Sequence, residues 1–177
     1  MIPHLREGCN TIHPMQKPLD RIDFEIIRLL RDNARTSNKQ IAAKVGLAPS
    51  TCLTRVRNLR RGGTLRGFHA DVNAGDLGVG LQAMIAVRLK RQSHEDVESF
   101  RYHALNTPEV NQLYHVAGST DFLVHVWARD SEHLRELAMK AFTDREEVAH
   151  IETGLIFEHT ISAELPSFLD WDSDEET

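Results

Sequence analysis

Cysteine is scarce in this chain of 177 residues, which contains only Cys9 and Cys52. Two cysteines cannot form the dense disulfide framework of a small secreted domain, so we expect a cytoplasmic, reducing location. Cys52 falls on the apolar side of a predicted helix, and the sequence offers it no histidine partner. We therefore interpret it as a small core residue rather than a catalytic nucleophile.

The first 18 residues lack any apolar run long enough for a signal peptide or a membrane span, and they contain three prolines. We predict that they form a mobile N-terminal arm, and no membrane role is expected. The hydrophobic content of 41% still permits real cores, and 177 residues are a comfortable length for two domains.

Acidic residues are missing between Asp32 and Asp71. The whole chain has a formal charge of −5, which by itself argues against a nucleic-acid partner. However, residues 19–69 contain eleven Lys/Arg against four Asp/Glu, a charge of +7, whereas residues 70–177 carry −13. A polyanion would therefore meet the N-terminal half first.

The basic half contains a stretch, residues 36–61, that predicts two short helices with a tight joint. Ser37 is placed to cap the first helix, and Gln40 completes a capping box. Gly46 supplies the left-handed turn that ends this helix, and Pro49 occupies the first position of the next. This arrangement is typical of a helix-turn-helix.

The second helix of the pair is amphipathic when residues 50–61 are placed on a wheel. Its apolar side consists of Cys52, Leu53, Val56 and Leu59. Small hydroxyls let a helix approach a duplex, and arginines reach phosphates or the guanine edge. We predict DNA contacts from the polar side, by Ser50, Thr51, Thr54, Arg55, Arg57, Asn58 and Arg61. The alternative is a solvated helix face without a ligand.

Many residues in the N-terminal half resemble the leucine-responsive/asparagine-responsive (Lrp/AsnC, feast/famine) transcription regulators. They are Leu19, Asp20, Asp23, Ile26, Asn33, Ala34, Arg35, Ile41, Ala42, Val45, Gly46, Leu47, Arg55, Val56, Leu59 and Gly63. Later elements follow in the family order: Phe68, His69, Ala70, Leu77, Gly78, residues 116–123 and residues 151–153. The resemblance covers about residues 19–162. Ala48 departs from it, since the family usually has a serine cap there.

The fold expected from these patterns is α+β: an N-terminal three-helix winged helix-turn-helix and a C-terminal ferredoxin-like βαββαβ domain. Asp20 is placed to cap the first helix, and residues 19–63 form the DNA-binding domain. Residues 64–79 are expected to be strand and linker, with a strand over 64–72 that presents Arg66 to phosphate as a wing would. Residues 166–177 form an acidic tail.

The second domain is expected over residues 80–165, where the apolar period changes from helical to alternating. We predict strands at 83–89, 110–117, 122–128 and 151–161, with helices starting after Ser93 and at Ser131. If both helices cover one face of the sheet, the other face needs a partner. We therefore predict sheet-to-sheet homodimers.

The resemblance implies that this second domain senses an amino acid or related small molecule and assembles dimers further, often to octamers. The effector positions carried over from the family motif are Gly118, Ser119, Thr120, Asp121 and Thr153. Amides of the turn would hold an α-carboxylate, and Asp121 would pair with an α-ammonium. The alternative is that residues 118–121 form an ordinary hairpin turn.

Catalytic and metal sites are not expected. His115, His125 and His159 lie on predicted strands, but no compact Cys/His spacing is present, and no nucleophile–base pair appears. We expect no cofactor. Two functions remain open: a regulator that places paired reading helices in successive major grooves of double-stranded DNA, and an amino-acid-sensing or assembly module that does not bind DNA.

Overall fold

A computed structural model of the chain describes residues 18–162 and 164–169. Residues 1–17, which are all but the last residue of the predicted N-terminal arm and include Cys9, lie outside the described residues, as does the end of the acidic tail from residue 170. The chain forms two compact units, one built from helices and one around a sheet, and each is described by itself.

Three helices make up the first unit: α1 (Arg21–Asp32), α2 (Asn38–Val45) and α3 (Pro49–Arg61). Asp20 caps α1, and Ser37 caps α2; each has the reciprocal contact of a capping box. Gly46 ends α2 with φ of 70°, a conformation that a residue with a Cβ resists. These expectations are confirmed. No helix in the described part of the chain is long and apolar enough to cross a bilayer.

The core of the first unit is formed by apolar residues from all three helices. It consists of Ile26, Leu29, Leu30, Ile41, Ala42, Cys52, Val56 and Leu59. Cys52 is fully buried, and burial raises the pKa of its thiol, as expected for a core residue. Because burying one large aliphatic side chain contributes about 1.5–3 kcal/mol, these contacts hold the three helices together.

Arg55 fastens α3 to the start of α1. Its Nη1 lies 2.6 Å from Asp20 Oδ2 and 2.8 Å from Asp23 Oδ1. Burial raises the pKa of Asp20, but the Asp23 amide and the Arg55 guanidinium outweigh it and hold that pKa below the usual 3.8. The cap of α1 is thus also an ion-pair partner of α3.

The prediction of a strand over residues 64–72 is wrong, since this segment is irregular. The Leu65 amide donates to the Leu59 carbonyl at 3.0 Å, and Leu65 packs against the helical core. The Arg60 guanidinium lies over the Phe68 ring, 5.9 Å from its centroid. A strand needs a partner strand for its backbone groups, and the described residues supply none here.

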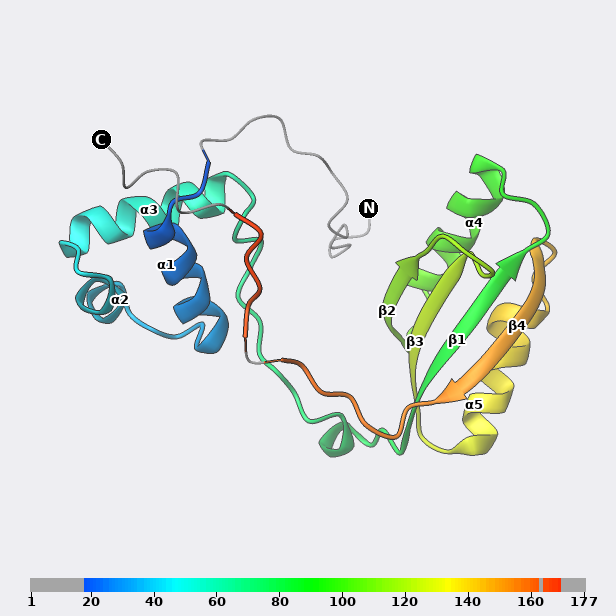
Figure 1. Cartoon of the computed structure of the whole chain (residues 1–177). Coiled ribbons are helices and arrows are strands. Elements are labelled where there is room, and N and C mark those ends of the chain that lie inside the picture. The colour runs from blue at the N-terminus through cyan, green and yellow to red at the C-terminus, as the bar shows by residue number, and fades with distance from the viewer. Residues whose placement is uncertain (1–17, 163, 170–177) are drawn as a thin grey trace. The chain divides into compact units, whose positions relative to one another are not determined.

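The second unit is a four-stranded antiparallel sheet in the order β2-β3-β1-β4. Its elements in chain order are β1 (Leu81–Leu89), α4 (His94–Leu105), β2 (Val110–His115), β3 (Phe122–Ala128), α5 (Ser131–Leu137) and β4 (Val148–Leu155). A short 3₁₀ turn, η1 (Ala74–Leu77), precedes them. Both helices pack on the same face of the sheet (Figure 1). The predicted ferredoxin-like βαββαβ order is confirmed.

Alternate residues of β1 form the centre of the second core. Ala83, Ile85 and Val87 are fully buried on the helix-covered face, as the alternating pattern predicts. From α4, Phe100 packs on Phe122 of β3 with ring centroids 4.8 Å apart. The core of this unit therefore lies between the sheet, with β1 at its centre, and the helices that cover it.

The last strand runs over Val148–Leu155 and not over the expected residues 151–161. Its extent is set by β1, because Leu89 pairs with Val148 and Ala83 pairs with Leu155. Beyond Ile156, whose amide donates to the Gln82 carbonyl at 2.9 Å, β1 has almost no residues left to pair. Tertiary pairing, rather than the alternating pattern, fixes the ends of this strand.

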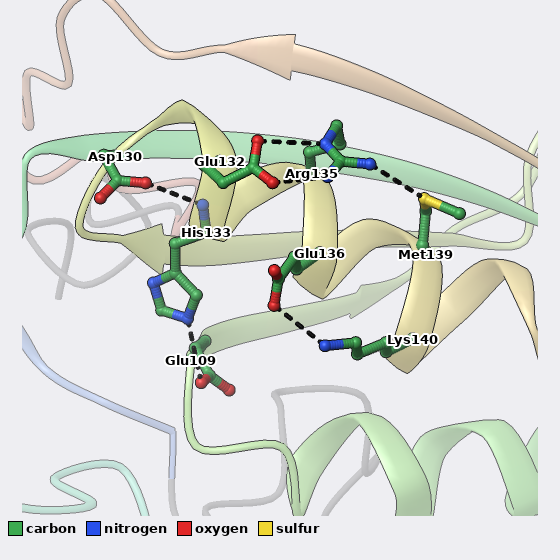
Figure 2. Close-up of polar contacts among 8 residues, drawn as sticks. All are labelled: Glu109, Asp130, Glu132, His133, Arg135, Glu136, Met139 and Lys140. Atoms are coloured by element: carbon green, nitrogen blue, oxygen red, sulfur yellow. Dashed lines mark hydrogen bonds and ion pairs between the residues drawn. The ribbon is translucent and has the colours of Figure 1, made fainter.

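Helix α5 begins at a cap and continues into a wider π turn, η2 (Ala138–Thr143) (Figure 2). The Asp130 carboxylate accepts from the His133 amide at 2.8 Å, and the His133 ring lies 3.4 Å from Glu109 in the loop before β2. Exposed pairs such as Glu136–Lys140 line the outer face and contribute little, about 0.3–0.5 kcal/mol.

We expect Ala48→Ser to stabilise the protein by about 1 kcal/mol. Ala48 is the N-cap of α3 and has extended backbone angles, but its side chain forms no cap hydrogen bond. A serine hydroxyl there would satisfy an amide of the first turn. Urea unfolding measures the change. Ala43→Ser, at an exposed position inside α2, is the matched control and should be slightly destabilising; equal effects at the two positions would contradict the cap.

We expect Arg55→Gln to lower the free energy of unfolding at pH 7 by about 1 kcal/mol, a figure kept small because these side chains are partly solvated. Asp20 has a lowered pKa, so its contribution is complete above the unfolded value and is lost as the pH falls through the folded one.

The difference between wild type and Arg55→Gln should therefore shrink below about pH 4. Urea titrations at pH 7 and pH 3 test it. Arg57→Gln on the exposed side of α3 is the control and should change stability by less than about 0.5 kcal/mol. A loss that is as large at pH 3 as at pH 7 would exclude the ion pair as its cause.

Candidate functional site

Six of the seven predicted DNA-contacting residues are exposed on α3. They are Ser50, Thr51, Thr54, Arg57, Asn58 and Arg61. The Thr54 hydroxyl donates to the Ser50 carbonyl at 3.0 Å, and Arg61 Nη2 donates to Asn58 Oδ1 at 2.6 Å. The fold thus presents hydroxyl, amide and guanidinium groups along one exposed face, the chemistry that reads a groove.

Arg55 lies apart from this set. Only 26% of its side chain is exposed, and its guanidinium is directed to Asp20 and Asp23 of its own helical unit. The sequence wheel missed this because the partners are 32 and 35 residues away. Asp20 and Asp23 could be recognised as capping residues, but the same carboxylates serve a second, tertiary contact.

A hollow of about 380 Å³ lies at the C-terminal end of α3. It is lined by Arg57, Arg60, Arg61, Leu65 and Arg66. Four guanidinium groups around one hollow favour an anion, and cations at a helix C-terminus also suit its dipole. Arg60 was not among the predicted contacts, although the density of arginines between residues 57 and 66 was visible in the sequence.

The second unit has a cavity of about 600 Å³ at one end of β1 and β3. It is lined by Arg88, Leu89, Lys90, Arg91, Gln92, Gly118, Ser119 and Asp121. Three predicted effector residues, Gly118, Ser119 and Asp121, are therefore brought together. Gly118 has φ of 133°, so a side chain at this position would strain the turn.

Asp121 forms the buried wall of the cavity and is only 5% exposed. Its Oδ2 accepts from the Leu89 amide at 2.7 Å, and its Oδ1 accepts from Gln92 Nε2 at 2.6 Å. Each carboxylate oxygen therefore already holds a donor of the same subunit. The primary effect of Asp121 is to fasten the end of β1 to the turn before β3.

The remaining predicted effector residues, Thr120 and Thr153, do not line the cavity. Thr153 lies on β4 and pairs with Ile85, and β1 separates β4 from β3 in the sheet. Sequence reasoning missed the residues from Arg88 to Gln92. They lie about thirty positions from the turn, and only the antiparallel pairing of β1 with β3 brings them to it.

Two of the three histidines considered as metal ligands, His115 and His125, have other contacts. His115 stacks on Phe122 with centroids 4.7 Å apart, and His125 lies between Asn111 and Gln82 at 3.2 and 2.9 Å. Burial and the nearby His159 lower the pKa of His125, which favours the neutral ring. Among residues 18–162 and 164–169, no group of three or more His, Cys, Asp or Glu side chains is arranged to hold a metal.

Both units match known families. Residues 19–66 match the winged helix-turn-helix DNA-binding model, and residues 82–165 match the Lrp/AsnC ligand-binding domain model. The HTH-type transcriptional regulator AldR of Mycolicibacterium smegmatis is 43% identical over 143 residues, which cover 81% of this chain and 84% of that protein. The leucine-responsive regulatory protein of Rhizobium meliloti is 35% identical, covering 77% of this chain and 88% of that one.

Solved structures agree with this assignment. A transcriptional regulator from Neisseria meningitidis in complex with L-methionine has a TM-score of 0.75 at 28% identity, covering 84% of this chain and 97% of that one. Escherichia coli AsnC gives 0.72 at 26%, covering 82% and 96%. This chain has a helix-turn-helix followed by a ligand-binding domain, and it belongs to the Lrp/AsnC family of DNA-binding transcription regulators.

Proposed function

We propose that this regulator reads the major groove of double-stranded DNA with the exposed face of α3. The observation that carries the proposal is that the polar residues of α3 share this helix with three of the four arginines that line the hollow. Ser50, Thr51, Thr54 and Asn58 are assigned to base edges and nearby backbone. Arg57 and Arg61, with Arg60, are assigned to phosphates around the hollow.

Arg55 acts through position rather than by direct contact in this proposal. Its two ion pairs hold α3 against the start of α1. The orientation of α3 relative to α1 therefore depends on them. The same pairs are the one observation that favours the second candidate, an assembly or sensing module without DNA binding, because they remove a cation from the reading face. The salt dependence of duplex binding separates the two.

The cavity beside Gly118 is proposed to bind the effector, an amino acid or a related small molecule. Support comes from the cavity itself, from the positive φ of Gly118 that leaves this wall without a side chain, and from the related Neisseria regulator solved with L-methionine. Ligand binding there would act on assembly or on DNA affinity, because any ligand that prefers one arrangement of subunits shifts the population toward it.

The uncovered face of the sheet is proposed to form a homodimer, which then assembles further, to an octamer. Met84 and Ala86 of β1 alternate with the buried residues and therefore lie on the face opposite the helices. Leu123 pairs with Ala86 on the same face, and Tyr114 of β2, its neighbour, is 46% exposed. Paired subunits would place two α3 helices in successive major grooves, about 34 Å apart.

We expect Arg57→Ala to weaken binding of all duplexes to a similar degree and to reduce the slope of log K against log salt by about one unit. The physical reason is the loss of one phosphate contact with its released counterion. Fluorescence anisotropy over a salt series measures it. Arg101→Ala, on α4 of the other unit, is the control and should leave the slope unchanged. If no salt-dependent duplex binding is detected, the second candidate is supported.

We expect Ala86→Arg to convert the dimer into monomers, because a long charged side chain at the centre of the uncovered face, even with Glu152 opposite it on β4, would hold the partner's sheet away. Analytical ultracentrifugation measures the mass, and circular dichroism checks that the fold is retained. Ala43→Arg on the exposed side of α2 is the matched control and should remain dimeric or larger. An unchanged mass for Ala86→Arg would exclude this face as the interface.

A further inference from the structure

We propose that the cavity beside Gly118 selects a ligand with net negative charge, an acidic amino acid rather than a neutral aliphatic one. This inference rests on the proposed effector role of the same cavity and concerns the chemical class of the ligand. It follows from the charge, the hydrogen bonding and the polarity of the eight lining residues.

Cations dominate the lining of this cavity. Arg88, Lys90 and Arg91 contribute three positive groups, all of them exposed side chains. Arg91 Nε lies 3.5 Å from Asp96 Oδ2, so its charge is partly compensated by α4. Arg88 and Lys90 take part in no side-chain ion pair within the described part of the chain. Two cations are therefore left for a ligand.

The single lining carboxylate, Asp121, offsets only one of these three cations, so the lining keeps a net charge of +2. Asp121 is buried, and its two oxygens already accept hydrogen bonds from the Leu89 amide and from Gln92. Turning toward an α-ammonium would leave the Leu89 amide, a buried donor, without its acceptor. The expectation that Asp121 pairs with an ammonium group is thus replaced here by a wall-forming role.

The cavity also offers little apolar surface. Leu89 is the only aliphatic side chain among its eight lining residues. A leucine-like ligand would gain affinity mainly by burying methyl and methylene groups against apolar walls, and those walls are not provided. A second carboxylate, in contrast, would form charge-assisted hydrogen bonds with guanidinium or ammonium donors.

The turn supplies a place for the α-carboxylate that every amino acid carries. Ser119 borders the cavity, and within residues 18–162 and 164–169 the amides of the two lining residues Gly118 and Ser119 donate to no backbone carbonyl. Successive amides in a turn form a concavity that suits an anion. The side-chain carboxylate of an acidic ligand is then assigned to Arg88 and Lys90.

Isosteric pairs of ligands test the proposal on the unmodified full-length protein. Isothermal titration calorimetry with L-aspartate against L-asparagine, and L-glutamate against L-glutamine, compares ligands of nearly equal size that differ in one charge. We expect one of the acids to bind at least tenfold more tightly than its amide, with a preference that decreases as salt is raised. L-leucine and inorganic phosphate complete the set.

Variants then locate the charge that is responsible. Arg88→Gln and Lys90→Gln should each weaken binding of the preferred acid about fivefold to tenfold and leave the amide unchanged. Arg129→Gln removes the same charge after the opposite end of β3 and should leave both ligands unchanged. Thermal melts confirm that each variant is folded; if a variant does not fold, the isosteric comparison on the natural protein still decides.

Three results would overturn the proposed selectivity. They differ in whether the effector role of the cavity is also excluded. If an amide or L-leucine binds as tightly as the acids, the selectivity is excluded while the effector role stands. If inorganic phosphate binds as tightly as the acids, or Arg129→Gln causes the same loss, the cavity is only a general anion surface. If none of the twenty amino acids, titrated in the same way, binds, the effector role and the selectivity are both excluded, whereas the DNA-binding role is untouched.

Discussion

The pairing of β1 with a strand on each side is the constraint on which the second unit depends. β1 hydrogen-bonds to β3 along one edge and to β4 along the other, and its alternate residues form the centre of the core. One consequence is local: where β1 ends, Asp121, just before β3, accepts a hydrogen bond from the Leu89 amide. The end of this central strand and the buried carboxylate that binds it therefore both contribute to the lining of the cavity beside Gly118.

In the helical unit, one side of α3 is exposed while the other side is packed against the core. Apolar burial holds α3 through Cys52, Val56 and Leu59, but burial is not directional. Arg55 adds direction, because a guanidinium between two fixed carboxylates tolerates little rotation. The arginines left on the open side are then presented at a defined angle, and their shared hollow concentrates positive potential at the end of the helix.

The charge of the chain is divided between residues 19–69 and residues 70–177. Basic residues gather around α3, whereas the rest of the protein is acidic, so a polyanion is drawn to the helical unit and repelled from most of the other surface. The cavity beside Gly118 is a local exception within the acidic half, since arginine and lysine side chains line it. A small anion would thus be drawn to the cavity beside Gly118, whereas a long polyanion would be drawn to the basic residues around α3.

The sequence by itself determined the helices, the caps at Asp20 and Ser37, the βαββαβ order, and the polar face of α3, because capping and periodicity are local. Tertiary structure alone decided what local rules cannot reach. It turned Arg55 inward to carboxylates more than thirty residues away, left residues 64–72 without a strand partner, and ended β4 where β1 ends. It also carried Arg88 and Lys90 to the turn at Gly118 and left Thr153 across the sheet, since register between distant strands depends on the whole core.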